Sequence, residues 1–382
     1  MNQYAETKLV CLGEGGSFSG HPVRPAPWPI ARRGIDFGWV GEAGQQAPVA
    51  LERIRQGWHA AEPVMLAGFL GSDLGRIQGH VEQSERLVEK ILAGQEPNEL
   101  VDLGPYSERL AGSFELVSSL YDENDDQEIE KLEFQAVQEG RTIAEDVWMK
   151  VAWLSFFDDD ASLRFRFSFG MENYEDVAAD LLRERVAARL CDAIFPESGI
   201  ITENRELKLA LCGIIGVRDV EYVERIVYFN APQGGAQFHH DVERGHLGVI
   251  FAQLTGRTAW LALSTQALLA EMRSFLECPL GESVLGSFSD TAIADALGRY
   301  RAEPEVLRTA LNDPNDEAIE VLLNRTPEFF AQLVRNGHGF LVQPGDVLLL
   351  PQQGMDHCAW HSVYCLGEEM GEGLSFAIRE VA

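Results

Sequence analysis

All three side chains of the tripeptide His239-His240-Asp241 are of types that bind a divalent metal. In an extended strand alternate side chains share a face, so His239 and Asp241 would lie side by side while His240 points away. A second imidazole from a distant strand would complete a facial triad for an octahedral metal and leave three positions open. The alternative is an ordinary turn in which the same side chains only form hydrogen bonds. The segments downstream distinguish between a metal site and such a turn.

Four further segments follow in an order that predicts strands joined by tight turns. Residues 251–260 have the pattern of a strand, a turn at Gly256 and another strand, and residues 344–351 that of a turn followed by an apolar strand. His361 lies in the segment Trp-His-Ser-Val, and a last strand is predicted within 373–379. A histidine on a strand beside the first metal-binding pair would supply the missing imidazole.

The order HxD, QxxGxxxW, GDVLxxP, WHSV and LSF resembles the Jumonji-type (JmjC, cupin-8) branch of the Fe(II)/2-oxoglutarate oxygenases over residues 223–380. The resemblance implies that His239, Asp241 and His361 bind iron(II), with 2-oxoglutarate and O₂ as cosubstrates. His357 remains a competitor for the third ligand, because it would share a face with His361 on a regular strand.

The position where this family often has a lysine for the far carboxylate of 2-oxoglutarate is Thr258. An arginine fork also suits a carboxylate, and Arg379 on the last predicted strand resembles a replacement. Arg257 is its rival, although alternation places it on the opposite face from Thr258. Tyr228, Gln253 and Thr258 could donate hydrogen bonds to the cosubstrate. For all of these side chains, an ordinary role in the core or at the surface is the alternative.

The chain is strongly acidic. Lys and Arg total 31 against 60 Asp and Glu, so the formal net charge is −29. Such a surface repels phosphate backbones and anionic lipids, so we expect neither nucleic acid nor membranes as partners. Six dispersed cysteines without a CxxC pair, and the lack of a signal-like start, predict a cytoplasmic protein with free thiols.

Hydrophobic periodicity predicts an α+β protein. Helices are expected at 51–92, 129–151 and 174–194, and strands at 163–169, 223–229, 237–241, 247–254, 259–263, 339–342, 347–350, 359–364 and 374–378. The expected organisation is an extended arm at 1–50, a mainly helical region at 51–220, and a barrel at 221–382.

The barrel is expected to be a double-stranded β-helix (cupin or jelly roll) that carries a helical insertion at 264–336. The apolar positions of the insertion should be buried against the barrel or the N-terminal helices, because short amphipathic helices are marginal alone. These positions are Leu268, Met272, Phe275, Leu307, Leu323 and Phe330.

The sequence supports one main function and leaves two alternatives. The main hypothesis is an Fe(II)/2-oxoglutarate-dependent hydroxylase that acts on a small molecule, an amino acid or a peptide. A metal-dependent cupin dioxygenase or isomerase without 2-oxoglutarate is favoured by Thr258 in the lysine position. A non-catalytic cupin binding protein is disfavoured by the complete set of His239, Asp241 and His361.

Overall fold

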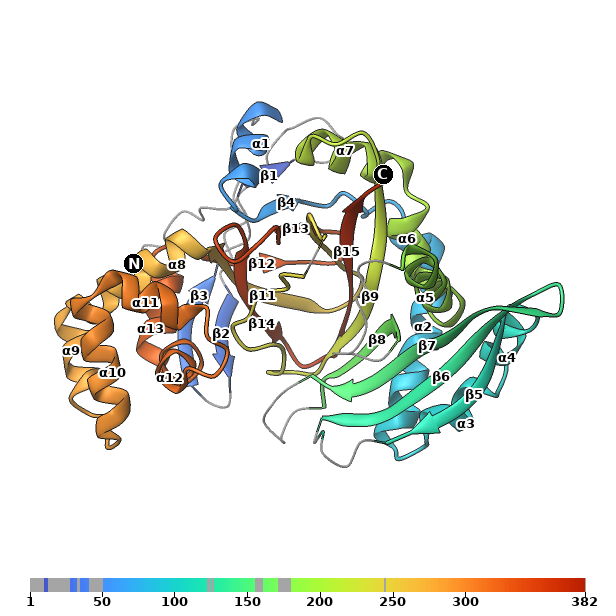
Figure 1. The fold of residues 1–382 in the computed structure, drawn as a ribbon, viewed down its shortest axis with the longest axis horizontal. Helices are drawn as coiled ribbons and strands as arrows, with labels where there is room; N and C mark the ends of the chain where they lie inside the picture. The colour runs from blue at the N-terminus through green and yellow to red at the C-terminus, as the bar shows by residue number, and fades with distance from the viewer. Residues whose placement is uncertain are drawn as a thin grey trace.

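The computed structural model describes residues 10–12, 28–32, 35–40, 51–121, 125, 127–154, 161–170, 180–243 and 245–381. Runs of helices and runs of mostly antiparallel strands follow one another along this part of the chain, as expected for an α+β protein. Two sheets lie at the centre, and helices cover the outer face of each (Figure 1).

The large sheet has ten strands in the order β1-β4-β13-β10-β15-β9-β8-β7-β6-β5. Its neighbours are antiparallel except for β1 and β4, which pair in parallel. The strands are β1 (Val10–Leu12), β4 (Val64–Leu66), β5 (Phe114–Leu120), β6 (Glu128–Gln138), β7 (Arg141–Trp153), β8 (Leu163–Phe169), β9 (Val220–Asn230), β10 (Gly248–Gln253), β13 (Val347–Pro351) and β15 (Gly371–Glu380).

The small sheet has three antiparallel strands in the order β12-β11-β14. They are β12 (Gly339–Val342), β11 (Arg257–Ser264) and β14 (Ala359–Leu366). The inner faces of the two sheets share one apolar cluster, to which Phe251 and Leu350 contribute from the large sheet and Trp260 and Val363 from the small one. Two antiparallel sheets that share a core in this way agree with a jelly-roll-like fold.

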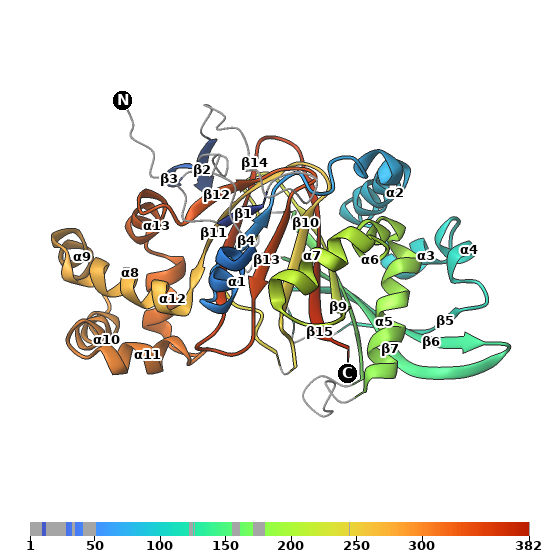
Figure 2. The same cartoon turned by 90° about the horizontal axis from the view of Figure 1, so that it is seen from above.

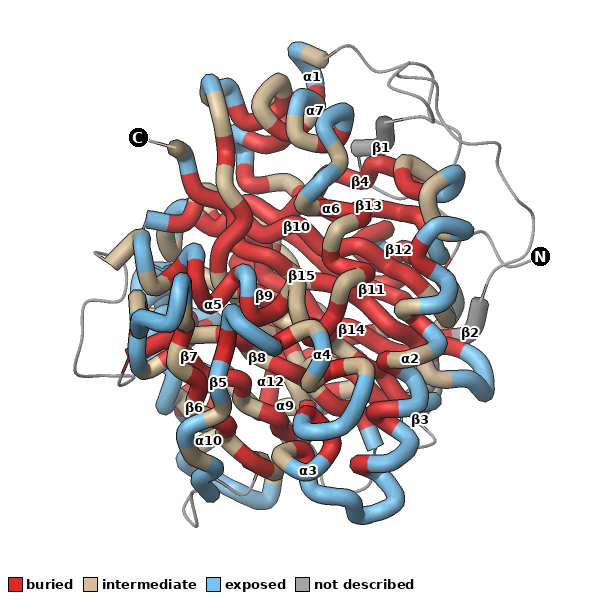
Figure 3. Tube along the Cα trace, turned by 90° about the vertical axis from the view of Figure 1, so that its right-hand side faces the viewer, coloured by how far each residue is buried: buried red, intermediate tan, exposed pale blue. Residues whose placement is uncertain are grey.

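Helices from the first half of the chain cover the outer face of the large sheet (Figure 2). Because strands in the middle of this sheet are covered on both sides, β10 and β13 are buried along their whole length, as Figure 3 shows for the centre of the molecule. The covering elements are α1 (Leu51–His59), α2 (Leu74–Leu92), α3 (Pro97–Val101), α4 (Tyr106–Leu110), α5 (Leu181–Ile194), the 3₁₀ helix η3 (Pro196–Ser198), α6 (Gly199–Thr202) and α7 (Arg205–Ile215).

The insertion between β11 and β12 is helical and lies against the outer face of the small sheet (Figure 2). All six apolar positions expected to be buried are 4% exposed or less, and they share one cluster with residues of β11 and β14. The helices are α8 (Thr265–Glu277), α9 (Pro279–Leu285), α10 (Thr291–Ala302), α11 (Pro304–Leu311), α12 (Glu317–Asn324) and α13 (Pro327–Arg335).

The helix predicted at 129–151 is wrong, because this segment forms the hairpin of β6 and β7. Its Glu and Lys residues are good helix formers, but Leu132, Phe134 and Ala136 are buried at every second position. Glu139 and Gly140 both have positive φ, as tight hairpin turns require. The region 51–220 therefore contains the strands β4 to β8 in addition to its helices, and the strand predicted at 163–169 coincides with β8.

Most of the expected N-terminal arm lies outside the described residues. Its described parts are β1, which extends the large sheet, and a hairpin of β2 (Trp28–Arg32) and β3 (Ile35–Val40), which contacts α13. Residues 174–179 of the helix predicted at 174–194 are also not described, and α5 begins at Leu181. Across the described ranges, every helix is too short or too polar to cross a membrane.

Candidate metal centre

The structure brings His239, Asp241 and His361 together at one end of the space between the two sheets. Asp241 Oδ1 lies 3.6 Å from His239 Nε2, and Asp241 Oδ2 lies 3.4 Å from His361 Nε2. Neighbouring ligands of an octahedral ion with bonds of about 2.1 Å lie roughly 3 Å apart. The distances from Asp241 to the two imidazoles exceed this spacing by only a few tenths of an ångström, and the ligand atoms of all three side chains lie within 4.8 Å of one another.

Backbone pairing fixes the two histidines opposite each other. His239 N–H donates to His361 C=O and His361 N–H donates to His239 C=O, both at 2.9 Å, so the two residues form an antiparallel bridge. Gly235 makes this approach possible, since a Cβ there would lie 2.2 Å from Val363 O and its φ is +131°. The expected strand at 237–241 is thus a single bridge, although its ligands still converge.

The ring nitrogens that face the carboxylate are free to bind a metal. His239 Nδ1 lies 2.7 Å from Gln237 C=O, and His361 Nδ1 lies 3.2 Å from Ala359 C=O. Because a carbonyl oxygen only accepts, each Nδ1 carries the hydrogen and each Nε2 offers its lone pair. Both imidazoles therefore hold the tautomer that coordination by Nε2 requires.

The charges of the site also suit a cation. Burial, together with the neighbouring His239, lowers the pKa of His361 to about 4, so its imidazole is neutral at pH 7. Burial opposes ionisation of Asp241, but His361 and His239 still hold the pKa of this carboxyl below its usual range. A neutral His361 and an ionised Asp241 are the protonation states in which these side chains coordinate metals.

His357, the competing third ligand, lies outside this group. The ligand atoms of His239, Asp241 and His361 all lie within 4.8 Å of one another, and His357 is not part of the cluster. It occupies the turn before β14, which begins only at Ala359, so the alternation assumed between His357 and His361 does not apply.

Gln352, which sequence reasoning did not single out, ties the aspartate to the strand of His361. Its Oε1 accepts from Asp241 N–H at 3.2 Å, and its Nε2 donates to Ala359 C=O at 2.9 Å. The residue is fully buried, directly after Pro351 at the end of β13. In the sequence, the only sign of its role was a polar residue directly after the apolar run 347–351.

We expect Gln352→Ala to weaken metal binding by about 10- to 100-fold, the usual effect of removing a residue that orients a ligand. The fold should persist, because β13 keeps its strand neighbours. Metal titration of the variant checks this, with the exposed neighbour Gln353→Ala as the matched control. Equal affinities for the two variants would contradict the role of Gln352.

The helical insertion also helps to position the triad. Asn324, the last residue of α12, accepts a hydrogen bond from Phe238 N–H at 2.9 Å through its side-chain oxygen. Phe238 directly precedes His239, and its ring lies near Phe330 of α13 at a centroid distance of 6.1 Å. A segment far along the chain thus holds the start of the metal-binding tripeptide.

A small cavity of about 20 Å³ adjoins the triad. Its polar lining comes from Tyr228, Asn230 and Ser375, and its largest apolar walls are Phe251 and Trp260. The ring of Trp260 stacks against that of His361 at a centroid distance of 5.4 Å and an angle of 20°. Among the described residues no Lys or Arg lines this cavity.

Of the residues expected to hold 2-oxoglutarate, only Tyr228 lines the cavity. Arg379 is buried, its Nη2 lies 3.2 Å from Glu184 Oε1 of α5, and it does not line the cavity. Burial raises the pKa of Glu184 to about 7 in spite of Arg379, so this carboxyl needs a cation beside it to ionise. Thr258 donates to Gln253 Oε1 at 2.7 Å, so these two side chains bond each other.

A second cluster with metal-binding side chains lies close by, but an arginine already contacts its carboxylates. Ligand atoms of Glu224, Glu243 and His246 lie within 4.8 Å of one another. Arg166 contacts both carboxylates, at 3.5 Å from Glu224 and 3.6 Å from Glu243. Because the guanidinium is already there, we interpret this cluster as a contact that attaches the loop after Asp241 to β8 and β9, and not as a metal site.

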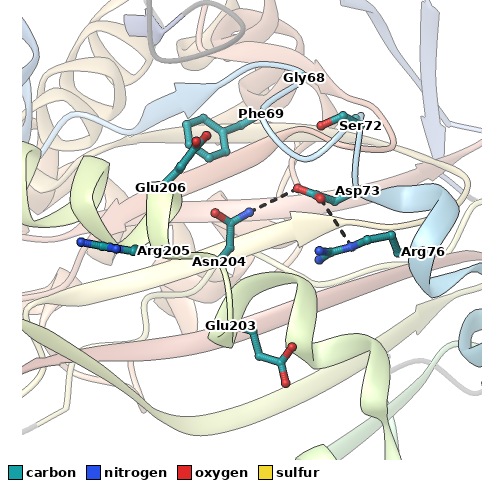
Figure 4. Close-up of a pocket in the computed structure, with 10 residues that line it drawn as sticks. Gly68, Phe69, Ser72, Asp73, Arg76, Glu203, Asn204, Arg205 and Glu206 are labelled. Atoms are coloured by element: carbon teal, nitrogen blue, oxygen red, sulfur yellow. Dashed lines mark hydrogen bonds and ion pairs between the residues drawn. The ribbon is translucent and has the colours of Figure 1, made fainter.

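A larger cavity, of about 660 Å³, is unrelated to the triad residues (Figure 4). It lies between the start of α2 and the start of α7, and Asp73 bonds both Asn204 (3.4 Å) and Arg76 (3.5 Å) in it. Its lining is polar and mixed in charge, with Arg205 and Glu206 on the opposite side. Its residues belong to none of the motifs described above.

Comparison with known proteins gives structural neighbours only. No model of a known protein family matches the chain, and no curated protein matches it. An oxidoreductase of the 2OG-Fe(II) oxygenase family from Burkholderia pseudomallei is 8% identical, with 87% of this chain and 91% of that chain covered and a TM-score of 0.30.

Two structures of YcfD from Escherichia coli, one described as a ribosomal oxygenase, are 15% and 14% identical. They cover 73% and 68% of this chain, with TM-scores of 0.23 and 0.24. The alignment spans less than half of each YcfD chain, at 46% and 41%.

The neighbours are oxygenases. One is described as a member of the 2OG-Fe(II) oxygenase family and another as a ribosomal oxygenase. TM-scores this low carry no weight for the chemistry, which depends on the side chains of the triad.

Proposed function

We propose that this chain is a mononuclear iron(II) oxygenase that acts on a small molecule, an amino acid or a peptide. The observation that supports it is the convergence of His239 Nε2, His361 Nε2 and the Asp241 carboxylate on one point. Two imidazoles and one carboxylate are the ligand set of non-haem iron(II) oxygenases. When bound there, iron(II) supplies the one-electron chemistry that activates O₂.

The chain's own residues would bind the ion, and apolar side chains shield its inner side. His239 and His361 present Nε2 because their Nδ1 atoms bond backbone carbonyls, and Asp241 supplies the negative charge. Apolar side chains including Trp260 and Val363 wall the adjoining cavity, which protects reactive species from side reactions with solvent.

The finer architecture is part of the same proposal. We assign residues 221–382 to a double-stranded β-helix barrel with the insertion 264–336, and 51–220 to a region packed on it. The two facing sheets and their shared apolar cluster support this assignment. The net charge of −29 favours a neutral or cationic substrate.

The proposal has two forms, which differ in the cosubstrate. Use of 2-oxoglutarate is supported by the order of the sequence motifs. A metal-dependent cupin oxygenase without 2-oxoglutarate is supported by the small cavity and its lack of a cationic lining residue. The complete triad supports both forms over a non-catalytic binding protein.

We expect His361→Ala to lose bound iron(II) and His357→Ala to keep it, because only His361 faces Asp241. Iron content after anaerobic loading and gel filtration measures the difference, and circular dichroism confirms that both variants fold. Retention of full iron stoichiometry by His361→Ala, or its loss from His357→Ala alone, would show that the metal centre is assigned wrongly.

A further inference from the structure

The space beside the triad is too small for 2-oxoglutarate. A cavity needs roughly 10–15 Å³ to hold one water, whereas pockets for organic ligands measure about 300–1,000 Å³. The cavity of about 20 Å³ therefore holds one molecule of the size of water or O₂. A five-carbon dicarboxylate that chelates the ion and extends between the sheets has no place there.

Large side chains fill the space, and they are firmly held. Trp260 stacks on His361, and Phe251 lies against Trp260 at a centroid distance of 4.7 Å. Both Trp260 and Phe251 are 3% exposed or less, and they belong to the apolar cluster that joins the two sheets. Moving Trp260 aside would break this packing and a hydrogen bond of its indole.

The polar side chains next to Trp260 satisfy one another. Trp260 Nε1 donates to Thr258 Oγ1 at 2.9 Å, and Thr258 donates to Gln253 Oε1 at 2.7 Å. Gln253 Nε2 donates to the carbonyl oxygens of Thr255 and Glu372 at 2.6 Å and 3.2 Å. This closed chain occupies the lysine position of the family motif and presents no charge to a carboxylate.

The nearest arginines have other partners. Arg379 pairs with Glu184, and Arg166 pairs with Glu224 and Glu243. Arg164, which lies beside Tyr228 across the β8–β9 ladder, donates to the side chain of Gln127 at 3.4 Å. A carboxylate in a buried site needs a fixed cation, and none of these three lines the cavity.

We infer that the triad works without 2-oxoglutarate and that its inner cavity takes a diatomic or water-sized ligand. Two polar groups that line the cavity suit such a ligand: the Tyr228 hydroxyl, and Asn230 Oδ1, which is buried and has no hydrogen-bond partner among the described residues. The four electrons that reduce O₂ then come from the organic substrate, as in a dioxygenation that places both oxygen atoms in one substrate. This inference rests on the proposed iron(II) site.

Ligand titrations of the metal-loaded protein test the inference without a substrate. Cobalt(II) replaces iron(II), and visible absorption reports each ligand that reaches the ion. We expect azide to change the spectrum and 2-oxoglutarate to leave it unchanged up to about 1 mM, the upper end of typical KM values. A parallel anaerobic titration of the iron(II) protein should show no charge-transfer band with 2-oxoglutarate.

The variant Trp260→Ala tests the same inference from the other side, because it is expected to gain binding of 2-oxoglutarate. Removal of the indole opens the space beside His361, so the variant should respond to 2-oxoglutarate although the wild type does not. Trp148→Ala, which removes a buried indole from β7 away from the triad, is the control. If Trp260→Ala folds and gains no response, occlusion by Trp260 is the wrong explanation and the inference falls.

The possible failures can be told apart. A spectral change of the wild type with 2-oxoglutarate would overturn this inference and leave the iron(II) oxygenase intact. A wild-type protein that binds neither iron(II) nor cobalt(II) would overturn the proposed function and this inference with it. The wild-type titration decides the matter even if Trp260→Ala does not fold.

Discussion

Asp241→Ala is expected to lower the affinity for iron(II) by more than about 100-fold and to abolish oxygenase activity. Replacing a residue that only orients a ligand already costs about 10- to 100-fold, and Asp241 is itself a ligand and the one anion of the triad. The two neutral imidazoles that remain do not offset the charge of the ion. Equilibrium dialysis under nitrogen measures the loss.

His240→Ala is the matched control. The His240 ring lies edge-on against Trp360 at a centroid distance of 4.7 Å, away from the cluster formed by its two neighbours. This variant should keep iron(II) binding within a few fold. If Asp241→Ala and His240→Ala bind iron(II) equally well, the metal centre lies elsewhere.

A second large effect is expected at two buried carboxyls on the outer side of the large sheet. Glu372 of β15 and Glu197 of η3 are 1% and 0% exposed, and Ser84 of α2 donates to Glu372 Oε2 at 3.1 Å. Among the described residues, neither oxygen of Glu197 nor Oε1 of Glu372 has a hydrogen-bond partner. Burial, and then the proximity of Glu197, raises the pKa of Glu372, and burial also raises the pKa of Glu197.

The sign of the pH dependence follows from these raised pKa values. Below about pH 4.3, the ordinary pKa of a Glu, the folded and unfolded states are both protonated and neither carboxyl costs stability. Above about pH 4.3 these two carboxyls lose their protons in the unfolded state and keep them in the folded state. The free energy of unfolding then falls by about 1.4 kcal/mol per pH unit for each carboxyl, until pH reaches the folded-state pKa.

Glu372→Gln should therefore flatten the fall in stability between about pH 5 and pH 8. The amide keeps the shape of the side chain but cannot ionise. Urea unfolding of the metal-free protein at several pH values gives the slope, and Glu277→Gln, at an exposed position of α8, is the control. If the free energy of unfolding fell equally steeply with pH in Glu372→Gln and in the wild type, the pKa of Glu372 would not be raised.

Local patterns were enough to predict the strands around the site. β8 and β12 have the bounds that were expected, and β13, β14 and β15 extend the expected strands by a few residues. Period-2 alternation and glycine turns are properties of neighbouring residues, so they can be read without knowledge of the fold. The same signal was present in β6, where alternation outweighed the helix propensity of its Glu and Lys residues.

Residue types and spacing also indicated that His239 and Asp241 act as a pair. Two residues of one strand face can be recognised from neighbouring positions alone, without knowledge of distant segments. The choice of His361 over His357 is different. The bridge between His239 and His361 and the start of β14 at Ala359 bring His361 to Asp241, and both depend on pairing between segments far apart in the chain. Sequence alternation alone left the two histidines equivalent.

Only the tertiary structure decided what surrounds the triad. Alternation could place Arg379 on the same face as Ser375, but its partner Glu184 comes from α5, which packs on the sheet from elsewhere in the chain. The size of the cavity likewise depends on how Trp260 and Phe251 of two different sheets meet. The ligand types are a local property of the sequence, whereas the room and charge around an ion are set by long-range packing.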